Sequence, residues 1–104
     1  KTMRFWGAAG PLLPQTLELV QRGVASAGLK ANAAAIEPHV MWADGVSEPM
    51  RQALVDPQTS GGLLMALSAS RVDGLLRRLR LSRIRAVVVG EVKPKRKHFL
   101  EVEA

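Results

Sequence analysis

Two short apolar runs on either side of an amphipathic segment limit most strongly what this chain can fold into. Leu63–Leu67 and Ala86–Val89 are apolar at successive positions, which is typical of strands that are covered on both faces. The segment between them predicts a helix, because its apolar residues recur at i, i+3, i+4 and i+7: Val72, Leu75, Leu76 and Leu79. Strand, helix and strand in this order predict a βαβ unit or a split version of one.

The N-terminal third predicts one strand and one helix. Alternating residues over 1–7 favour a short strand. Pro14 suits the first turn of a helix, and Gly28 is expected to end that helix. The helix has an apolar stripe at helical spacing: Leu13, Leu17, Val20 and Val24. Residues 30–35 are expected to be irregular.

Further along, proline and capping residues set the expected boundaries. Residues 36–42 are rich in strand-forming types, but Pro38 excludes a central strand there. Ser47 is expected to cap a short helix that Asp56-Pro57 ends. Residues 93–97 predict a charged turn, and residues 98–103 predict an edge strand.

These elements predict a single domain over residues 1–104, because 104 residues supply one modest core. The fold class is α/β or α+β, a two-layer arrangement in which two or three helices pack on a sheet.

Charge and composition narrow the function classes. The net charge is +6: residues 71–97, with ten basic and two acidic residues, carry +8, and the rest of the chain carries −2. That segment has no aromatic residues for base stacking, so nucleic acid is not an expected partner and the arginines are read as a solvated face. No apolar run approaches the roughly 20 residues of a membrane span, so no membrane partner is expected either. The absence of cysteine excludes disulfides, thiolate zinc sites and a cysteine nucleophile, and fits a cytoplasmic setting.

The candidate site is the polar stretch that enters the first apolar run. Its glycines can take positive φ and its hydroxyls can bond nearby backbone, so it is either a tight turn or a phosphate cradle. The candidate substrate- or phosphate-binding residues are Asp56, Thr59, Ser60, Gly61 and Gly62. His39 and His98 have no partner at ligand spacing, and no carboxylates are paired. Neither a metal site nor a catalytic residue is therefore expected.

The string DPQTSGGLL over Asp56–Leu64 resembles the C-terminal domain of selenophosphate synthetase (selenide, water dikinase), within the AIR synthase-related superfamily. Three further segments are similar to that family in order and spacing. They are Leu12-Leu13-Pro14 leading into a helix, Gly28 with Asn32, and the segment VVVGEV at 87–92. The resemblance adds Asn32 to the candidate substrate- or phosphate-binding residues. The resemblance extends over most of residues 12–92.

The resemblance implies a parent enzyme that makes selenophosphate from selenide, ATP and water, releases AMP and phosphate, and uses Mg²⁺. If part of the domain is missing, the cover of the two apolar runs must come from a second copy or stay exposed, so we also expect a dimer or other homo-oligomer. The family's catalytic cysteine or selenocysteine, its lysine and its ATP contacts lie in an N-terminal domain, which has no match in this chain. We therefore expect these residues to need that ATP-binding domain as a partner, to bind no cofactor alone and to be inactive alone. In this reading Thr59–Gly62 faces the cleft between the two domains.

Two alternatives stay open from the residues. One is another ATP-dependent enzyme of the same superfamily, against which the string PQTSGG argues. The other is a stand-alone basic module that binds nucleic acid or another polyanion.

Overall fold

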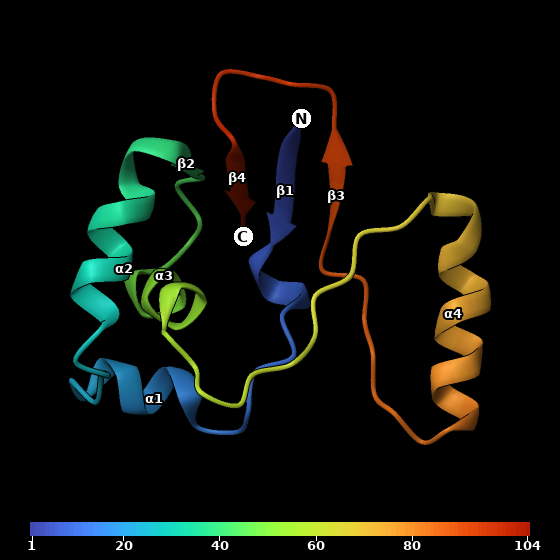
Figure 1. Cartoon of the computed structure of the whole chain (residues 1–104). Helices are drawn as coiled ribbons and strands as arrows, with labels where there is room; N and C mark the ends of the chain where they lie inside the picture. The colour runs from blue at the N-terminus through green and yellow to red at the C-terminus, as the bar shows by residue number, and fades with distance from the viewer.

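A computed structural model describes all residues from 1 to 104 and confirms a mixed fold of helices and strands (Figure 1). The strands are β1 (Thr2–Trp6), β2 (Val40–Trp42), β3 (Gly90–Lys93) and β4 (Leu100–Glu103). The helices are α1 (Thr16–Gln21), α2 (Leu29–Ile36), α3 (Glu48–Val55) and α4 (Ala69–Leu81), with two short 3₁₀ turns at Gly7–Ala9 and Glu37–His39. None of these helices has both the length and the apolar character that crossing a membrane requires.

The four strands form one mixed sheet in the order β2-β4-β1-β3. β4 pairs in parallel with both β2 and β1, and β3 pairs antiparallel with β1. The expected edge strand at 98–103 is therefore wrong, because β4 lies inside the sheet. Its neighbours on both sides bury Glu101 and Val102.

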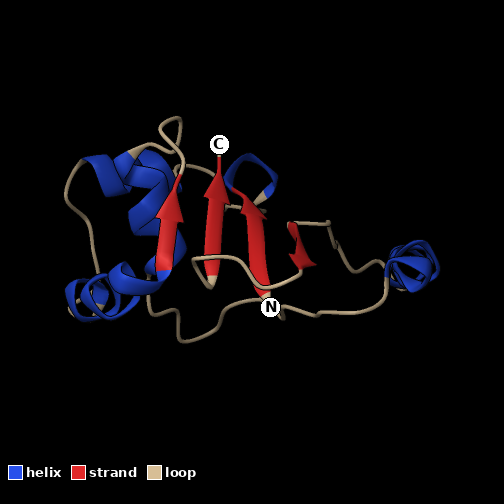
Figure 2. Ribbon diagram, turned by 90° about the horizontal axis from the view of Figure 1, so that it is seen from above, coloured by secondary structure: helices blue, strands red, loops and turns tan.

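The core lies where the sheet meets the first three helices. Val40, Val46 and Val102 form its buried centre, and Trp42 and Met50 pack against it. Figure 2 shows α1, α2 and α3 gathered at the β2 side of the sheet, while α4 stands apart beyond β3. The opposite face of the sheet is polar, with Arg4 of β1 beside Glu101 of β4.

Two boundaries in the first half differ from the sequence prediction. α1 ends before Gly23, not at Gly28: Gly23 has φ +82° and donates its N–H to Val20 O at 2.9 Å. Val24 N donates to Leu19 O at 3.0 Å and completes this glycine-terminated helix end. The expected irregular region at 30–35 is wrong as well, because α2 occupies it. Its alanine-rich sequence has high intrinsic helix propensity.

The boundaries expected at Pro38, Ser47 and Asp56 are confirmed, whereas α1 begins only at Thr16, so Pro14 lies before the helix and not in its first turn. Pro38 lies in a 3₁₀ turn, and the short β2 that follows is an edge strand. Ser47 is the N-cap of α3, and its Oγ accepts from Met50 N at 3.4 Å. Asp56 adopts an extended conformation and ends α3 just before Pro57.

Residues 59–89, here called the arm, depart most from expectation; residues 1–58 and 90–104 are called the body. α4 forms as predicted, but neither Leu63–Leu67 nor Ala86–Val89 is a strand. Trp6 N donates to Val89 O at 2.9 Å, and β1 then turns into the 3₁₀ segment at Gly7, so the ladder ends there. Apart from this one bond, no strand pairs with either apolar run, and the predicted βαβ unit does not form.

The arm also expands the molecule. The Cα radius of gyration is 14.7 Å, whereas a compact domain of this length has about 13 Å. In both views the arm leaves the body as an extended chain, reaches α4 and returns to β3 (Figures 1 and 2).

Candidate functional site

Asp56, the first residue of the candidate stretch, ties two distant parts of the body together. Its Oδ1 accepts a hydrogen bond from Ser26 Oγ at 2.8 Å, across 30 residues of sequence. Its backbone oxygen accepts from Gln58 N at 3.0 Å. Asp56 therefore anchors the end of α3 to the linker between α1 and α2, as a helix-end residue.

Asn32 supports the same helix end from α2. Its Nδ2 donates to the carbonyl oxygen of Val55 at 2.9 Å. The last carbonyls of a helix lack partners within the helix, and this side chain supplies one. The structure thus brings Asn32 and Asp56 together around the end of α3, where both have structural contacts.

Gly28 explains how this junction becomes so close. A Cβ at Gly28 would lie 2.9 Å from Cγ of Pro57. Only glycine allows the α1–α2 linker to approach the proline of the candidate stretch at this distance. The resemblance pointed to Gly28, but the reason for a glycine there is a packing contact with Pro57.

Thr59, Ser60, Gly61 and Gly62 lie outside this junction as an exposed turn. Neither Gly61 nor Gly62 adopts the positive φ that is open to glycine. No hydrogen bond within the chain involves the side chains of Thr59 and Ser60 or the backbone N–H groups of residues 59–62. The loop therefore presents free donors to its surroundings.

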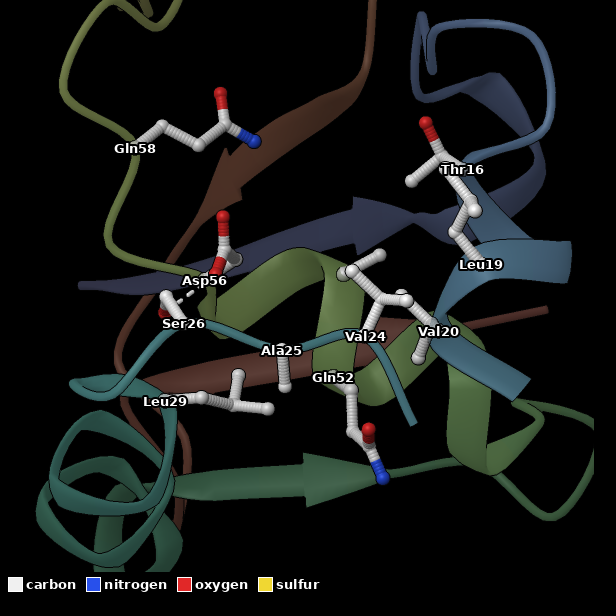
Figure 3. Close-up of a pocket in the computed structure, with 11 residues that line it drawn as sticks. Thr16, Leu19, Val20, Val24, Ala25, Ser26, Leu29, Gln52, Asp56 and Gln58 are labelled. Atoms are coloured by element: carbon white, nitrogen blue, oxygen red, sulfur yellow. Dashed lines mark hydrogen bonds between the residues drawn. The ribbon is translucent and has the colours of Figure 1, made fainter. Parts of the chain in front are cut away.

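A hollow of about 260 Å³ lies between α1, α2 and α3, next to the anchored aspartate (Figure 3). Its apolar lining includes Leu19, Val20, Val24, Leu29 and Ala53, and polar residues such as Thr16 and Gln52 also line it. In Figure 3 Ser26 and Asp56 point toward each other at its rim, and Gln58 lies farther out. A wider, open hollow of about 610 Å³ adjoins the other side of Asp56 and includes Asn32 and His39.

The structure gives His39 a packing contact and His98 a backbone contact. His39 meets Phe99 edge to face, with ring centroids 5.8 Å apart and planes at 72°. The carbonyl oxygen of His98 accepts from Oγ1 of the fully buried Thr2 at 2.8 Å. The structure contains no group of three or more histidine, cysteine, aspartate or glutamate residues able to hold a metal ion. These residues therefore do not fit a Mg²⁺ site.

The sequence reading missed the charge cluster on the polar face of the sheet. Arg4 Nη2 lies 3.0 Å from Glu101 Oε2, and Arg4 Nε lies 3.2 Å from Glu103 Oε1. Lys93 Nζ lies 2.8 Å from Glu91 Oε1. The hydrogen bond to Glu101 raises the pKa of the Arg4 guanidinium. The hydrogen bond from Lys93 lowers the pKa of the Glu91 carboxyl.

These charges satisfy one another, so the cluster holds three strands together and offers no free acid or base. Alternation along β1 placed Arg4 on one face, but only the register reveals that Glu91 and Glu101 are its direct neighbours. Ser26, the partner of Asp56, had no local signal either.

The arginines of α4 behave as the sequence predicts. Arg71, Arg77, Arg78 and Arg80 are exposed, and no arm residue forms an ion pair. The stripe Val72, Leu75, Leu76 and Leu79 is half-buried.

No family profile matches this chain. Curated relatives do, and they carry the name selenide, water dikinase. The protein from Nitratidesulfovibrio vulgaris is 40% identical over 85 residues, which are 82% of this chain and 24% of the relative. The protein from Geobacter metallireducens is 39% identical over 94 residues, or 90% of this chain and 27% of the relative. The protein from Myxococcus xanthus is 32% identical over 83 residues, or 80% of this chain and 24% of the relative. The chain thus spans about a quarter of the length of these relatives, and the resemblance seen in Asp56–Leu64 is confirmed.

Proposed function

Because this chain is homologous to a segment of the selenide, water dikinases, we propose that it is a non-catalytic part of such an enzyme. In this proposal it belongs to the C-terminal domain of a cytoplasmic enzyme that makes selenophosphate from selenide, ATP and water, with Mg²⁺. The residues that carry the reaction belong to a separate ATP-binding domain, which is the partner of this segment. Two features support the proposal: the homology covers 80–90% of the chain, and the chain has no cysteine.

The Thr59–Gly62 loop is the part that we propose to meet the ATP-binding domain. The observation that carries this step is that its backbone N–H groups and two hydroxyls have no partner within the chain. Free donors at an exposed turn favour an anion, and a phosphate offers several acceptor oxygens. Asp56 and Asn32 are positioning residues in this proposal, because they hold the end of α3 from which the loop leaves.

A nucleic-acid function is not part of the proposal. The exposed arginines of α4 form a basic surface, but no aromatic residue lies among them for base stacking.

The first experiment tests the non-catalytic role. The isolated chain is mixed with ATP, Mg²⁺ and selenide, and AMP is measured against a sample without protein. We expect no AMP above that background. Appreciable AMP formation by the isolated chain would overturn the assignment.

The second experiment tests the loop in an active enzyme. The matching 94-residue segment of the Geobacter metallireducens enzyme is replaced by this chain, and AMP formation by the chimera is measured. Each hydrogen bond to a charged group contributes about 1.5–3 kcal/mol. The double substitution Thr59→Ala/Ser60→Ala should therefore lower AMP formation about tenfold or more. Ser70→Ala, at an exposed serine of α4, is the matched control and should leave it unchanged. A double variant as active as the chimera itself would remove the loop from the proposal.

A further inference from the structure

The wider of the two hollows lies between β1, β4 and α2 and has an aromatic pair in its lining. Its volume is about 610 Å³, and most of the residues that line it are apolar, among them Met3 and Leu100 of the two neighbouring strands. Phe99, directly before β4, is 55% exposed and meets the ring of His39 edge to face at 5.8 Å. An exposed aromatic face in an apolar hollow of this size favours a planar apolar ligand.

The loop between β3 and β4, residues 94–99, brings positive charge to the same end of the sheet. In both views it passes over the ends of β1 and β4 that lie beside the N-terminus (Figures 1 and 2). Lys95 and Lys97 are exposed and form no ion pair. Lys1 has no ion pair either, and alternation along β1 places it on the same side of the sheet as Met3, which lines the hollow. Three unpaired cations therefore lie near the aromatic part of the hollow.

The side chain of Thr2 fixes this loop. Thr2 is fully buried, and its Oγ1 accepts from Arg96 N at 2.8 Å and donates to His98 O at 2.8 Å. The backbone N–H groups of Lys95 and Lys97 have no partner within the chain. A fixed loop with unpaired N–H and ammonium groups suits an oxyanion, and a phosphate offers several acceptor oxygens.

We propose that the hollow and this loop together bind a small molecule in which a planar aromatic ring carries a phosphate group. The ring lies in the hollow against Phe99 and His39. The phosphate lies at the rim and meets Lys1, Lys95 and Lys97. The apolar lining selects the ring, and the charge of the loop selects the phosphate.

Charge also decides the orientation of the ligand. α2 runs along the hollow from Asn32, which bonds to Val55 O beside Asp56, to the turn with His39, which contacts Phe99. Asp56 is the one carboxylate in the lining, and it repels a phosphate. The phosphate therefore lies at the loop end and the ring points toward the end of α3. This inference does not depend on the proposed function, because it uses none of residues 59–62.

Isothermal titration calorimetry with three probes tests the proposal: 1-naphthyl phosphate, 1-naphthol and inorganic phosphate. Only naphthyl phosphate engages both the hollow and the loop, so it should bind about tenfold or more tightly than either other probe. Lys95→Ala/Lys97→Ala should lower its affinity about tenfold, and Phe99→Leu should lower it about threefold to tenfold. Arg77→Ala/Arg80→Ala removes two exposed cations of α4 and is the matched control, which should bind as the unsubstituted chain does. The substituted residues are all exposed, and circular dichroism checks that each variant is folded.

Four outcomes would overturn the proposal. Equal affinity for naphthyl phosphate and inorganic phosphate would show that the loop binds anions without the hollow. Equal affinity for naphthyl phosphate and naphthol would show that the hollow takes a ring without help from the loop. The same loss of affinity in the loop variant and in the α4 control would show a general effect of charge. No measurable binding of naphthyl phosphate would remove the site altogether.

Discussion

The body and the arm differ in burial although the arm is the more apolar of the two. Sixteen of the 31 arm residues are hydrophobic, a higher fraction than the 47% of the whole chain. Yet all eight buried residues lie in the body. Apolar composition supplies the driving force for burial, but a residue is buried only where another surface meets it. The arm has the composition of a core and lacks the partner.

The same contrast appears in the polar contacts. In the body, side-chain hydrogen bonds join residues from opposite ends of the sequence. Thr2 bonds to His98, and Arg4 bonds to Glu101. One backbone hydrogen bond, from Trp6 to Val89, joins the arm to the body. We therefore expect body substitutions to change the free energy of unfolding, while equivalent arm substitutions change it little in the monomer.

Matched glycines give the largest expected difference. In Gly90→Ala the new Cβ would overlap the carbonyl oxygen of Arg4, a backbone atom that cannot move without separating β3 from β1. We expect a loss of about 3 kcal/mol, as for severe overpacking. A Cβ at Gly62 meets nothing within 4 Å, so Gly62→Ala should change stability by less than about 0.5 kcal/mol. Urea unfolding followed by circular dichroism measures both, and equal midpoints would contradict the contrast.

Matched valines test the core itself. Val102 of β4 is 4% exposed, and Val102→Ala should cost about 2 kcal/mol through lost burial and an unfilled cavity. Val88 of the arm is 42% exposed, and Val88→Ala should cost less than about 0.5 kcal/mol. The measurement is the free energy of unfolding at low protein concentration. A Val88 variant that is destabilised as much as the Val102 variant would show that the arm packs on the body.

Matched serines compare the helix starts. Ser47 caps α3 through a hydrogen bond of 3.4 Å, so Ser47→Ala should cost about 0.5–1 kcal/mol. Ser68 occupies the same position in α4 but makes no side-chain capping bond, so Ser68→Ala should be neutral. Thermal unfolding followed by circular dichroism compares the two. If Ser68→Ala lowered the midpoint of thermal unfolding as much as Ser47→Ala, the predicted contrast between the two helix starts would be wrong.

The smallest expected effect concerns acid and the Glu91 carboxyl. Its folded pKa is lowered, mainly by the hydrogen bond from Lys93. A lowered folded pKa stabilises the protein above the unfolded value of about 4.3, and this stabilisation is lost as pH falls through the folded pKa. Glu91→Gln should therefore reduce the slope of stability against pH below about 4.3. Glu18→Gln, at a body residue without an ion pair, is the control. Identical slopes of stability against pH for the unsubstituted chain, Glu91→Gln and Glu18→Gln would rule out the effect.

Much of the local structure was determined by the sequence itself. Patterns within a few residues account for β1, for α4 and for the short β2 after Pro38. They also account for the N-cap and the C-terminal end of α3. The contiguous string from Asp56 to Leu64 likewise revealed the relationship to selenide, water dikinases. These features depend on capping, proline geometry and periodicity, which act between near neighbours along the chain.

The tertiary structure alone decided which surfaces meet. It placed β4 inside the sheet, paired Arg4 with Glu101 and made Asp56 and Asn32 anchors for the end of α3. It also left the two apolar runs of the arm exposed, although their sequence is that of buried strands. The physical reason is that burial and strand pairing depend on a partner distant in sequence, and a local pattern specifies only that a partner is needed.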